Sequence, residues 1–325
     1  MINVYIASCD KDGGIYRFAM NSDGTLAFLD KADIATPSYL AIDADKLHVT
    51  LRAPYDGSGE SAYTCFDIGS SGELLNMGAI IDADGVSACY LSVVGGAVYT
   101  TNYVTGSIKR FPDKLLKKSG GSNVKPDRQA SSHPHCIIPT PDGKCLAVTD
   151  LGCDTVTVYD RELNEISLTS TLPGAGPRHI TFSPDGALAY VINELMPYTT
   201  VYRYGDGKFE RLGEYPVLPY SFFGKFNGEG AGSAIRCVGD YLYVGIREEN
   251  KITCYRRVAD RLEYLFSSDT GGDHPRDFNI YGDILISANM VGNNVSVFRI
   301  DEGRGLTKIQ SLEIKTPTCV VFKEK

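Results

Sequence analysis

The sequence predicts an all-β fold, a seven-bladed β-propeller in which residues 1–325 form a single domain. Two observations support this: a four-residue segment recurs seven times along the whole chain, and Pro-Asp-Gly turns separate runs of period-two hydrophobicity. Neighbouring segments begin between 42 residues (275 to 317) and 55 residues (177 to 232) apart. A period of roughly 40–50 residues is typical of propeller blades. The seven segments begin at Pro37, Ala88, Pro134, Pro177, Gly232, Pro275 and Pro317.

The third repeat shows the expected blade most clearly. Residues 135–140 are predicted to form its first strand and residues 141–143 (Pro-Asp-Gly) a turn, because proline fixes φ and glycine accepts positive φ. Alternating hydrophobicity predicts three further strands over 144–149, 154–159 and 164–172. The same pattern predicts strands at 179–183, 187–192 and 199–204 in the fourth repeat, and at 276–280, 284–288 and 294–299 in the sixth.

The two ends of the chain together supply one blade. Only one strand fits between Pro317 and Lys325, and the N-terminal region offers three more, over 3–7, 14–18 and 25–31. We therefore expect a last blade made of one C-terminal strand and three N-terminal strands. Such a closure removes two exposed sheet edges, which are otherwise an aggregation hazard.

Two inserts interrupt the repeat. Residues 113–131 are rich in lysine and glycine and are predicted to be a polar loop. Residues 215–232 combine glycine with aromatic residues and account for the longest interval; they are interpreted either as a lid over a site or as a long exit loop before the fifth repeat. The chain has no tryptophan, so the Trp-Asp signature of WD40 blades is absent.

Composition excludes several classes of function. The net charge of −8 argues against a broad nucleic-acid or acidic-membrane surface, so any anion site must be local. No apolar run approaches the roughly 18 residues of a membrane span, and the N-terminus does not read as a secretory signal. The nine cysteines lie mostly in apolar strand segments without a CxxC pair, which indicates buried thiols in a reducing compartment. We expect a cytoplasmic protein.

Polar residues gather where the blades are predicted to meet. In an antiparallel meander, the loop before strand one and the loop after strand two lie at the same end of the ring, around one mouth of the central channel. The first loops and the adjoining strand starts carry His133, His135, Arg178 and Arg276, with Arg236 slightly deeper in the fifth repeat. The second loops carry Arg52, Asn102, Asp150, Asn193, Glu194, Arg247 and Asn289. Arginine forks bind carboxylate or phosphate, and a nearby histidine or carboxylate can activate water.

Structural explanations for these residues stay open at this point. The polar groups could fill the channel together with ordered water. His179 is expected to be a core or supporting residue, and Glu194 could simply neutralise Arg178. Asp150 and Asn289 could cap strand ends through bonds to the backbone. The sequence contains no Gly-x-Ser-x-Gly elbow, no His-Glu-x-x-His and no P-loop, which disfavours a standard serine hydrolase, a zincin or a P-loop nucleotide-binding protein.

Taken together, these segments resemble the seven-bladed propeller lactonases, which include bacterial 6-phosphogluconolactonases and fungal 3-carboxy-cis,cis-muconate lactonizing enzymes. The matching stretches are Asp127-Arg128-Gln129, Ser132-His133-Pro134-His135, residues 141–144, residues 149–154, Gly176-Pro177-Arg178-His179, residues 182–186, residues 189–195, Ser233-Ala234-Ile235-Arg236 and His274-Pro275-Arg276-Asp277-Phe278. The resemblance implies a site that includes His135, Arg178 and Glu194, with an arginine from Arg236 or the neighbouring blades. The chain departs from the family pattern at Ile246-Arg247 and at residues 7–10.

The leading hypothesis is a metal-independent and cofactor-free lactonase for a small anionic lactone, with 6-phosphogluconolactone as the first substrate to test. Glu194 or His135 would be the base for water, while Arg178, Arg236 and Arg276 would hold the anionic group and the oxyanion. Further substrate contacts are expected from Arg128, His133, Asp150, Asn193, Arg247 and Asn289. Alternatives are a lactonizing enzyme of the carboxymuconate type, a Ca²⁺-dependent hydrolase, or a non-enzymatic propeller that binds an anionic ligand or a protein partner. We expect a monomer or a weak homodimer.

Overall fold

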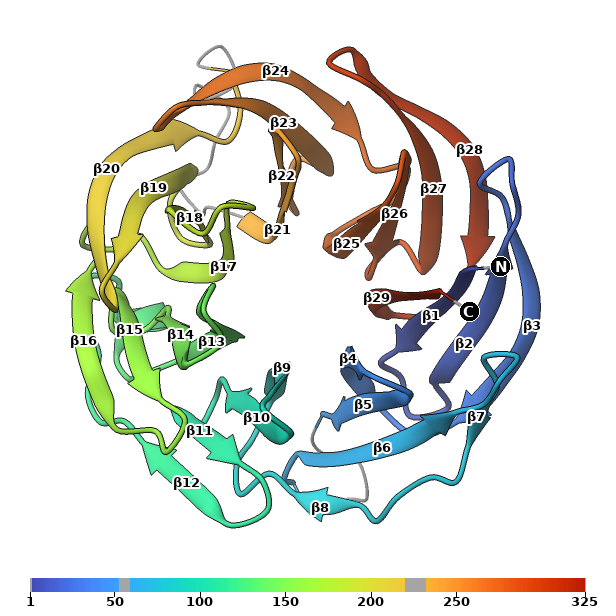
Figure 1. Ribbon diagram of the computed structural model, residues 1–325, viewed down its shortest axis with the longest axis horizontal. Helices are drawn as coiled ribbons and strands as arrows, with labels where there is room; N and C mark the ends of the chain where they lie inside the picture. The colour runs from blue at the N-terminus through green and yellow to red at the C-terminus, as the bar shows by residue number, and fades with distance from the viewer. Residues whose placement is uncertain (1, 53–58, 220–231, 325) are drawn as a thin grey trace.

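The chain forms a closed ring of seven β-sheets around a central axis (Figure 1). The computed structural model describes residues 2–52, 59–219 and 232–324. Each sheet is an antiparallel meander whose first strand lies nearest the axis and whose last strand lies at the rim. The predicted seven-bladed propeller is confirmed.

The blades follow one another in chain order. The first consists of β4 (Pro37–Asp43), β5 (Lys46–Leu51), β6 (Ala62–Ile68) and β7 (Leu74–Leu75), and β8 (Ile81–Asp82) also pairs with β6. The second consists of β9 (Ala88–Val94), β10 (Ala97–Asn102), β11 (Ser107–Arg110) and β12 (Lys114–Lys117). The third consists of β13 (Pro134–Pro139), β14 (Cys145–Asp150), β15 (Thr155–Asp160) and β16 (Glu165–Ser170).

The remaining blades repeat this plan. The fourth consists of β17 (Pro177–Phe182), β18 (Leu188–Asn193), β19 (Tyr198–Gly205) and β20 (Lys208–Pro216). The fifth consists of β21 (Gly232–Val238), β22 (Tyr241–Ile246), β23 (Lys251–Val258) and β24 (Arg261–Asp269). The sixth consists of β25 (Pro275–Tyr281), β26 (Ile284–Asn289), β27 (Asn294–Asp301) and β28 (Gly305–Glu313).

The seventh blade joins the two ends of the chain, as predicted. Its order is β29 (Pro317–Glu324), β1 (Ile2–Ser8), β2 (Gly14–Met20) and β3 (Leu26–Asp33). The N-terminal strand β1 pairs antiparallel with β29, so that Ile6 lies opposite Val320. Both side chains are fully buried, and they pack against Ile286 and Val297 of the sixth blade. Backbone hydrogen bonds and apolar contacts thus close the ring at the same place.

The two inserts differ from expectation in their details. The predicted polar loop 113–131 contains β12 and the short helix α1 (Pro126–Gln129). Leu115 and Leu116, at the centre of β12, pair with residues of β11. Lysines on both sides of these leucines gave the segment a polar composition, so the sequence did not indicate a strand. In the second insert β20 extends to Pro216, and Val217 and Leu218 are buried. The proposed lid falls largely on residues 220–231, which lie outside the described residues.

Seven inner strands surround the axis, and each carries an irregularity near its start. In six blades one residue of the inner strand has no partner on the neighbouring strand. In the fifth blade two consecutive residues of the inner strand lack such a partner. A β-bulge bends its strand and redirects a side chain, and bulges are common beside active sites. The bulged residues are Ser38, Cys89, His135, Arg178, Ser233 with Ala234, Arg276 and Thr318.

All nine cysteines are free thiols, but their burial is uneven. Cys136, Cys254 and Cys319 are buried as expected, and so is Cys89, whereas the other five are partly exposed, including Cys65, whose apolar strand segment had predicted burial. Within the described ranges, no helix is long and apolar enough to cross a membrane.

Candidate functional site

Two equivalent positions in every blade build the mouth of the channel. One is the bulged residue of the inner strand, and the other is the first residue after the second strand. In six blades the backbone N–H of this second residue donates to the carbonyl just before the inner strand, as Glu194 does to Gly176 at 2.7 Å and Arg52 to Thr36 at 2.9 Å. The second positions are Cys9, Arg52, Tyr103, Leu151, Glu194, Arg247 and Met290. The fold therefore presents a double ring of side chains at one end.

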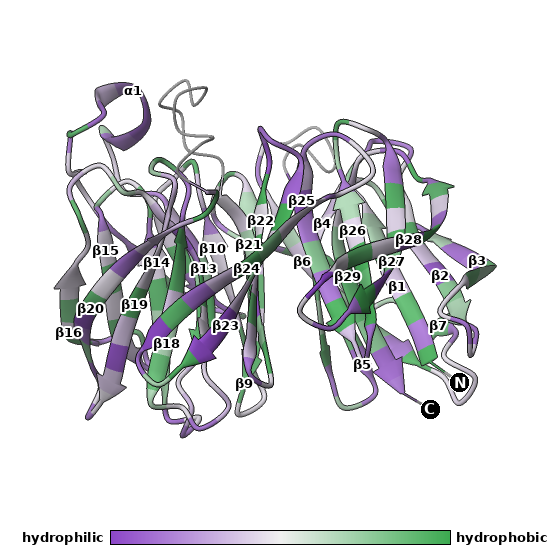
Figure 2. Cartoon of the chain, turned by 90° about the horizontal axis from the view of Figure 1, so that it is seen from above, coloured by the Kyte–Doolittle hydropathy of each residue, from purple (hydrophilic) through white to green (hydrophobic). Residues whose placement is uncertain are grey.

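A cavity of about 250 Å³ lies at this mouth. Arg128 of α1 lines this cavity, and α1 lies on the face of the ring opposite the two chain ends (Figure 2). Its lining residues are Arg52, Ser87, Cys89, Tyr103, Arg128, His135, Glu194 and Arg276. The sequence had placed His135, Glu194, Arg276 and Arg128 in the site, and the fold brings these four together from the third, fourth and sixth blades and from α1.

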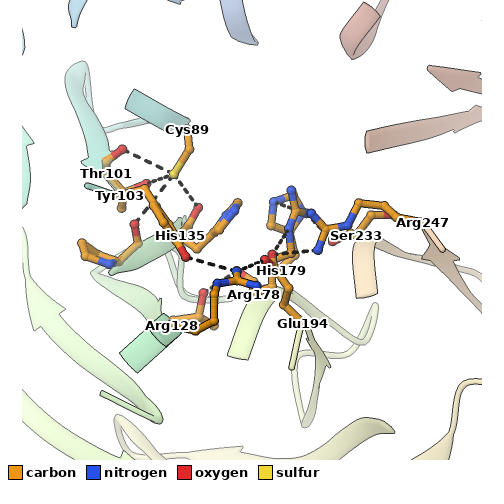
Figure 3. A network of polar contacts seen from close by, with 12 residues as sticks. Cys89, Thr101, Tyr103, Arg128, His135, Arg178, His179, Glu194, Ser233 and Arg247 are labelled. Carbon is orange, nitrogen blue, oxygen red and sulfur yellow. Dashed lines mark hydrogen bonds and ion pairs between the residues drawn. The ribbon is translucent and has the colours of Figure 1, made fainter. Parts of the chain in front are cut away.

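Glu194 is the centre of an arginine cluster. Its Oε1 lies 2.5 Å from Nη2 of Arg128, and its Oε2 lies 3.0 Å from Nε of Arg178 and 3.0 Å from Nη2 of Arg247 (Figure 3). Burial alone would raise the pKa of this carboxyl group, but the surrounding arginines, Arg247 first, outweigh that effect and hold the pKa well below its ordinary value. Glu194 is therefore a permanent carboxylate.

Arg178 is enclosed more completely than any other charged group at the mouth. Its side chain is only 2% exposed, and besides Glu194 it donates from Nη1 to Nε2 of His179 at 3.1 Å and to the carbonyl of Ser233. Burial and the nearby Arg276 and Arg247 lower its pKa to about 9. A guanidinium group keeps its proton in proteins, so Arg178 stays charged, and the shift reflects first its burial and then the neighbouring positive charges.

His135 forms part of the cavity wall as a neutral imidazole. The residue is 3% exposed, and its Nδ1 is buried with no hydrogen-bond partner among the described residues. Burial and then the charge of Arg178 lower its pKa well below the ordinary value of 6.5. Its ring centroid lies 5.6 Å from that of Tyr103 and 5.3 Å from that of His179. Edge-to-face contacts thus hold the His135 ring in place, and its neutral, unprotonated form is favoured.

An aromatic layer lies under the cavity and separates it from the rest of the channel. Tyr39 and Tyr90 stack with centroids 4.2 Å apart, and Tyr90 lies 5.0 Å from His179. Arg236 lies beyond this layer, in a separate cavity lined by all seven inner strands. It pairs there with Asp277 at 2.8 Å. The structure therefore does not bring Arg236 into the mouth, because it follows the bulge by three positions and faces a deeper level of the channel.

Four other predicted substrate contacts bond to neighbouring loops instead. Asp150 accepts from the backbone N–H groups of His133 and Cys153, and Nδ2 of Asn193 donates to the Tyr198 carbonyl. Asn289 donates to the Thr270 carbonyl. Nδ1 of His133 lies 2.6 Å from the Tyr103 carbonyl oxygen. Asp150, Asn193 and Asn289 are the last residues of their strands, and strand alternation points them away from the residue that follows. Their predicted binding roles stay untested.

Tyr103 is the main residue that sequence reasoning missed; Ser87 and Cys89, which also line the cavity, are the others. Tyr103 stacks on His133, accepts a hydrogen bond at its hydroxyl from Nη2 of Arg128 at 3.3 Å, and faces the cavity beside Glu194. Burial raises the pKa of its hydroxyl group, which therefore remains a proton donor. The available signal was its position one residue after Asn102, equivalent to Glu194 after Asn193.

No group of three or more His, Cys, Asp or Glu side chains is placed to hold a metal ion in the parts of the chain that the structure describes. Most of the charged side chains that line the mouth cavity are instead arginines, whose guanidinium groups repel cations.

Fold and mouth together define a class of protein, a β-propeller with an arginine-rich cavity at one end of its channel. Comparison with known proteins gives the family: the model described as "Lactonase, 7-bladed beta-propeller" matches residues 3–322. The chain belongs to this family.

Relatives and solved structures agree with that assignment. An uncharacterised protein of Lactococcus lactis, YwcC, is 32% identical over 95% of both chains, and one of Staphylococcus aureus is 30% identical over 99% of this chain and 100% of its own. The periplasmic gluconolactonase PpgL of Pseudomonas aeruginosa superposes with a TM-score of 0.88 at 25% identity over 99% of both chains. A putative 6-phosphogluconolactonase of Bacteroides fragilis gives 0.87 at 26% identity, covering 99% of this chain and 98% of its own.

Proposed function

We propose that this protein is a lactonase that hydrolyses an anionic sugar lactone, with 6-phosphogluconolactone giving 6-phosphogluconate as the leading reaction. One observation carries the proposal: five arginines lie in or directly beside a single cavity that holds a neutral histidine and only one carboxylate, and three of these arginines pair with that carboxylate. The five arginines are Arg52, Arg128, Arg178, Arg247 and Arg276. Such an excess of buried positive charge is costly unless an anion offsets it. Two proteins that share this fold are described as a periplasmic gluconolactonase and a putative 6-phosphogluconolactonase, which supports a sugar lactone as substrate.

His135 suits the role of general base better than Glu194. Both oxygens of Glu194 are already held by arginines, whereas the imidazole of His135 is neutral, lines the cavity, and has an Nδ1 that bonds to no described residue. The low pKa of its imidazole also makes the protonated form a good acid. Glu194 then acts as a positioning residue that fixes Arg128, Arg178 and Arg247 around the cavity.

The reaction follows from these placements. His135 takes a proton from water as the water oxygen bonds to the lactone carbonyl carbon, and the carbonyl oxygen becomes an oxyanion. Arg128, whose side chain is 44% exposed, and the Tyr103 hydroxyl stabilise this charge from the cavity side. The bond from the carbonyl carbon to the ring oxygen then breaks, and the proton held by His135 passes to that oxygen. The product is a hydroxy acid, and no cofactor is consumed.

Turnover of three substrates tests this proposal against its alternative. Freshly generated 6-phosphogluconolactone, glucono-δ-lactone and 3-carboxy-cis,cis-muconate are each offered to the enzyme, with the spontaneous rate as blank and with or without chelator. The proposal expects the phosphorylated lactone to be hydrolysed fastest and chelator to have no effect. Cyclisation of the muconate without lactone hydrolysis would establish a lactonizing enzyme instead.

The cytoplasmic location of this protein stays a prediction, since one structural relative is periplasmic. Its monomeric or weakly dimeric state also stays a prediction.

A further inference from the structure

Two arginines at the mouth form no ion pair with a carboxylate of the described residues. Arg52 follows β5 in the first blade, and Arg276 is the bulged residue of β25 in the sixth. Both line the mouth cavity, where the carboxylate of Glu194 is already bonded to three other arginines. Neither Arg52 nor Arg276 forms an ion pair with any acidic group in the described ranges.

The seventh blade leaves room between these two arginines. It lies between the sixth and first blades in the ring (Figure 1), and at the two mouth positions it contributes only the small side chains of Cys9 and Thr318. A narrow crevice there is shared by both arginines and adjoins the main cavity through Ser87 and Cys89. The crevice itself measures about 10 Å³, room for one water molecule, so the space that a larger anion could share between Arg52 and Arg276 is the adjoining main cavity of about 250 Å³.

The backbone holds Arg52 in place independently of any ligand. Its N–H donates to the Thr36 carbonyl at 2.9 Å, and its own carbonyl accepts from the Thr36 hydroxyl at 2.6 Å. Arg276 is fixed by the bulge between Pro275 and Asp277. Burial, Arg247 and Arg52 together lower the pKa of Arg276, which shows that positive charges repel one another here. An anion bound between Arg52 and Arg276 would offset this burial and repulsion.

We propose that Arg52 and Arg276 form a phosphate subsite, which makes this enzyme selective for lactones that carry a phosphate monoester over neutral sugar lactones. One guanidinium group balances the single charge of a carboxylate. Two guanidinium groups without a carboxylate partner among the described residues match a phosphate monoester, which carries a charge of about −1.5 to −2 at neutral pH. The phosphate would bind at the side of the cavity next to the seventh blade, and the lactone carbonyl would lie toward His135. This inference rests on the proposed lactonase function and names its substrate class.

Arg52→Gln and Arg276→Gln are the variants that test the subsite, with Arg203→Gln as control. Arg203 pairs with Glu210 on the exposed outer strands of the fourth blade, away from the mouth. In either subsite variant, the ratio of kcat/KM for 6-phosphogluconolactone to that for glucono-δ-lactone should fall about 10- to 100-fold, the usual worth of a charged hydrogen bond. The control should keep the ratio of wild type. An equal loss on both lactones would overturn the subsite.

A binding measurement separates the subsite from the reaction. Inorganic phosphate and 6-phosphogluconate should raise the Tm of wild type more than chloride at equal ionic strength or gluconate, and Arg52→Gln and Arg276→Gln should abolish the difference. Without ligand, Arg276→Gln should raise the Tm, because it removes a repelling charge. If wild type hydrolyses neither lactone yet these shifts occur, the subsite stands and the lactonase function is wrong. Phosphate stabilisation unchanged in both variants would refute the subsite even in an active enzyme.

Discussion

Glu194 and Arg178 form an ion pair of 3.0 Å in which the two side chains are only 7% and 2% exposed. The pair lies at the junction of the mouth and the core, and Arg247 and Arg128 complete it from two other parts of the chain. Removing one member of a buried pair leaves an uncompensated charge, which is much more costly than removing both. The pair therefore couples the stability of the fold to the geometry of the site.

Replacing Glu194 with Gln should destabilise the protein strongly. The change leaves Arg178 and Arg247 without their carboxylate, and we expect a loss of about 3–5 kcal/mol in the free energy of unfolding by urea titration. Glu210→Gln, which breaks an exposed pair, should cost less than about 1 kcal/mol. Arg178→Met combined with Glu194→Gln should cost less than the sum of the two single changes. Additive losses would show that the two side chains do not interact.

His135 should control the rate through its neutral form. Because the pKa of His135 lies well below 6.5, kcat/KM should stay constant from neutral pH to below pH 6.5 before it falls. His135→Gln should lower kcat by about 10²- to 10⁴-fold. His48→Gln serves as the matched buried histidine, since His48 contacts Tyr63 in the first blade and should affect stability without changing kcat. An acid limb that persists in His135→Gln but disappears in Glu194→Gln would assign the base to Glu194.

Tyr103→Phe should lower kcat by about 10- to 100-fold with little change in KM. The ring can still stack on His133, so the variant removes only the hydroxyl that faces the developing oxyanion. Tyr99→Phe in the same blade is the control, because its hydroxyl donates to the Arg161 carbonyl outside the mouth. If both variants leave kcat unchanged, Tyr103 only supports the histidine rings.

Stability should fall as the pH drops from 7 toward 5. His135 and His179 are buried with lowered pKa values, so below pH 6.5 the unfolded chain binds protons that the folded protein does not. Each histidine can contribute a slope of up to about 1.4 kcal/mol per pH unit in that window. His179→Gln should reduce the slope measured by urea unfolding at several pH values. A slope identical to wild type would mean that His179 is protonated in the folded state.

The repeat period, the turns and the closure of the ring were predictable from sequence because they are local or periodic. The sequence located the loops that form the mouth but not which of their residues face the cavity. Asn193 and Glu194 are adjacent, yet strand alternation directs Glu194 into the cavity and Asn193 toward the Tyr198 carbonyl. Arg236 was assigned to the mouth because its depth along the inner strand depends on a bulge that leaves no sequence signature. Tyr103 was overlooked because an aromatic residue after a strand resembles ordinary packing.

The most direct test of the lactonase account is the hydrolysis rate of freshly generated 6-phosphogluconolactone, coupled to a dehydrogenase that consumes 6-phosphogluconate. Wild type, His135→Gln and His48→Gln are compared at equal concentration, each corrected for spontaneous hydrolysis. The account predicts a wild-type rate far above the blank, retained in His48→Gln and lost in His135→Gln. A wild-type rate equal to the blank would contradict the assignment of this substrate, and full activity in His135→Gln would contradict the proposed site chemistry.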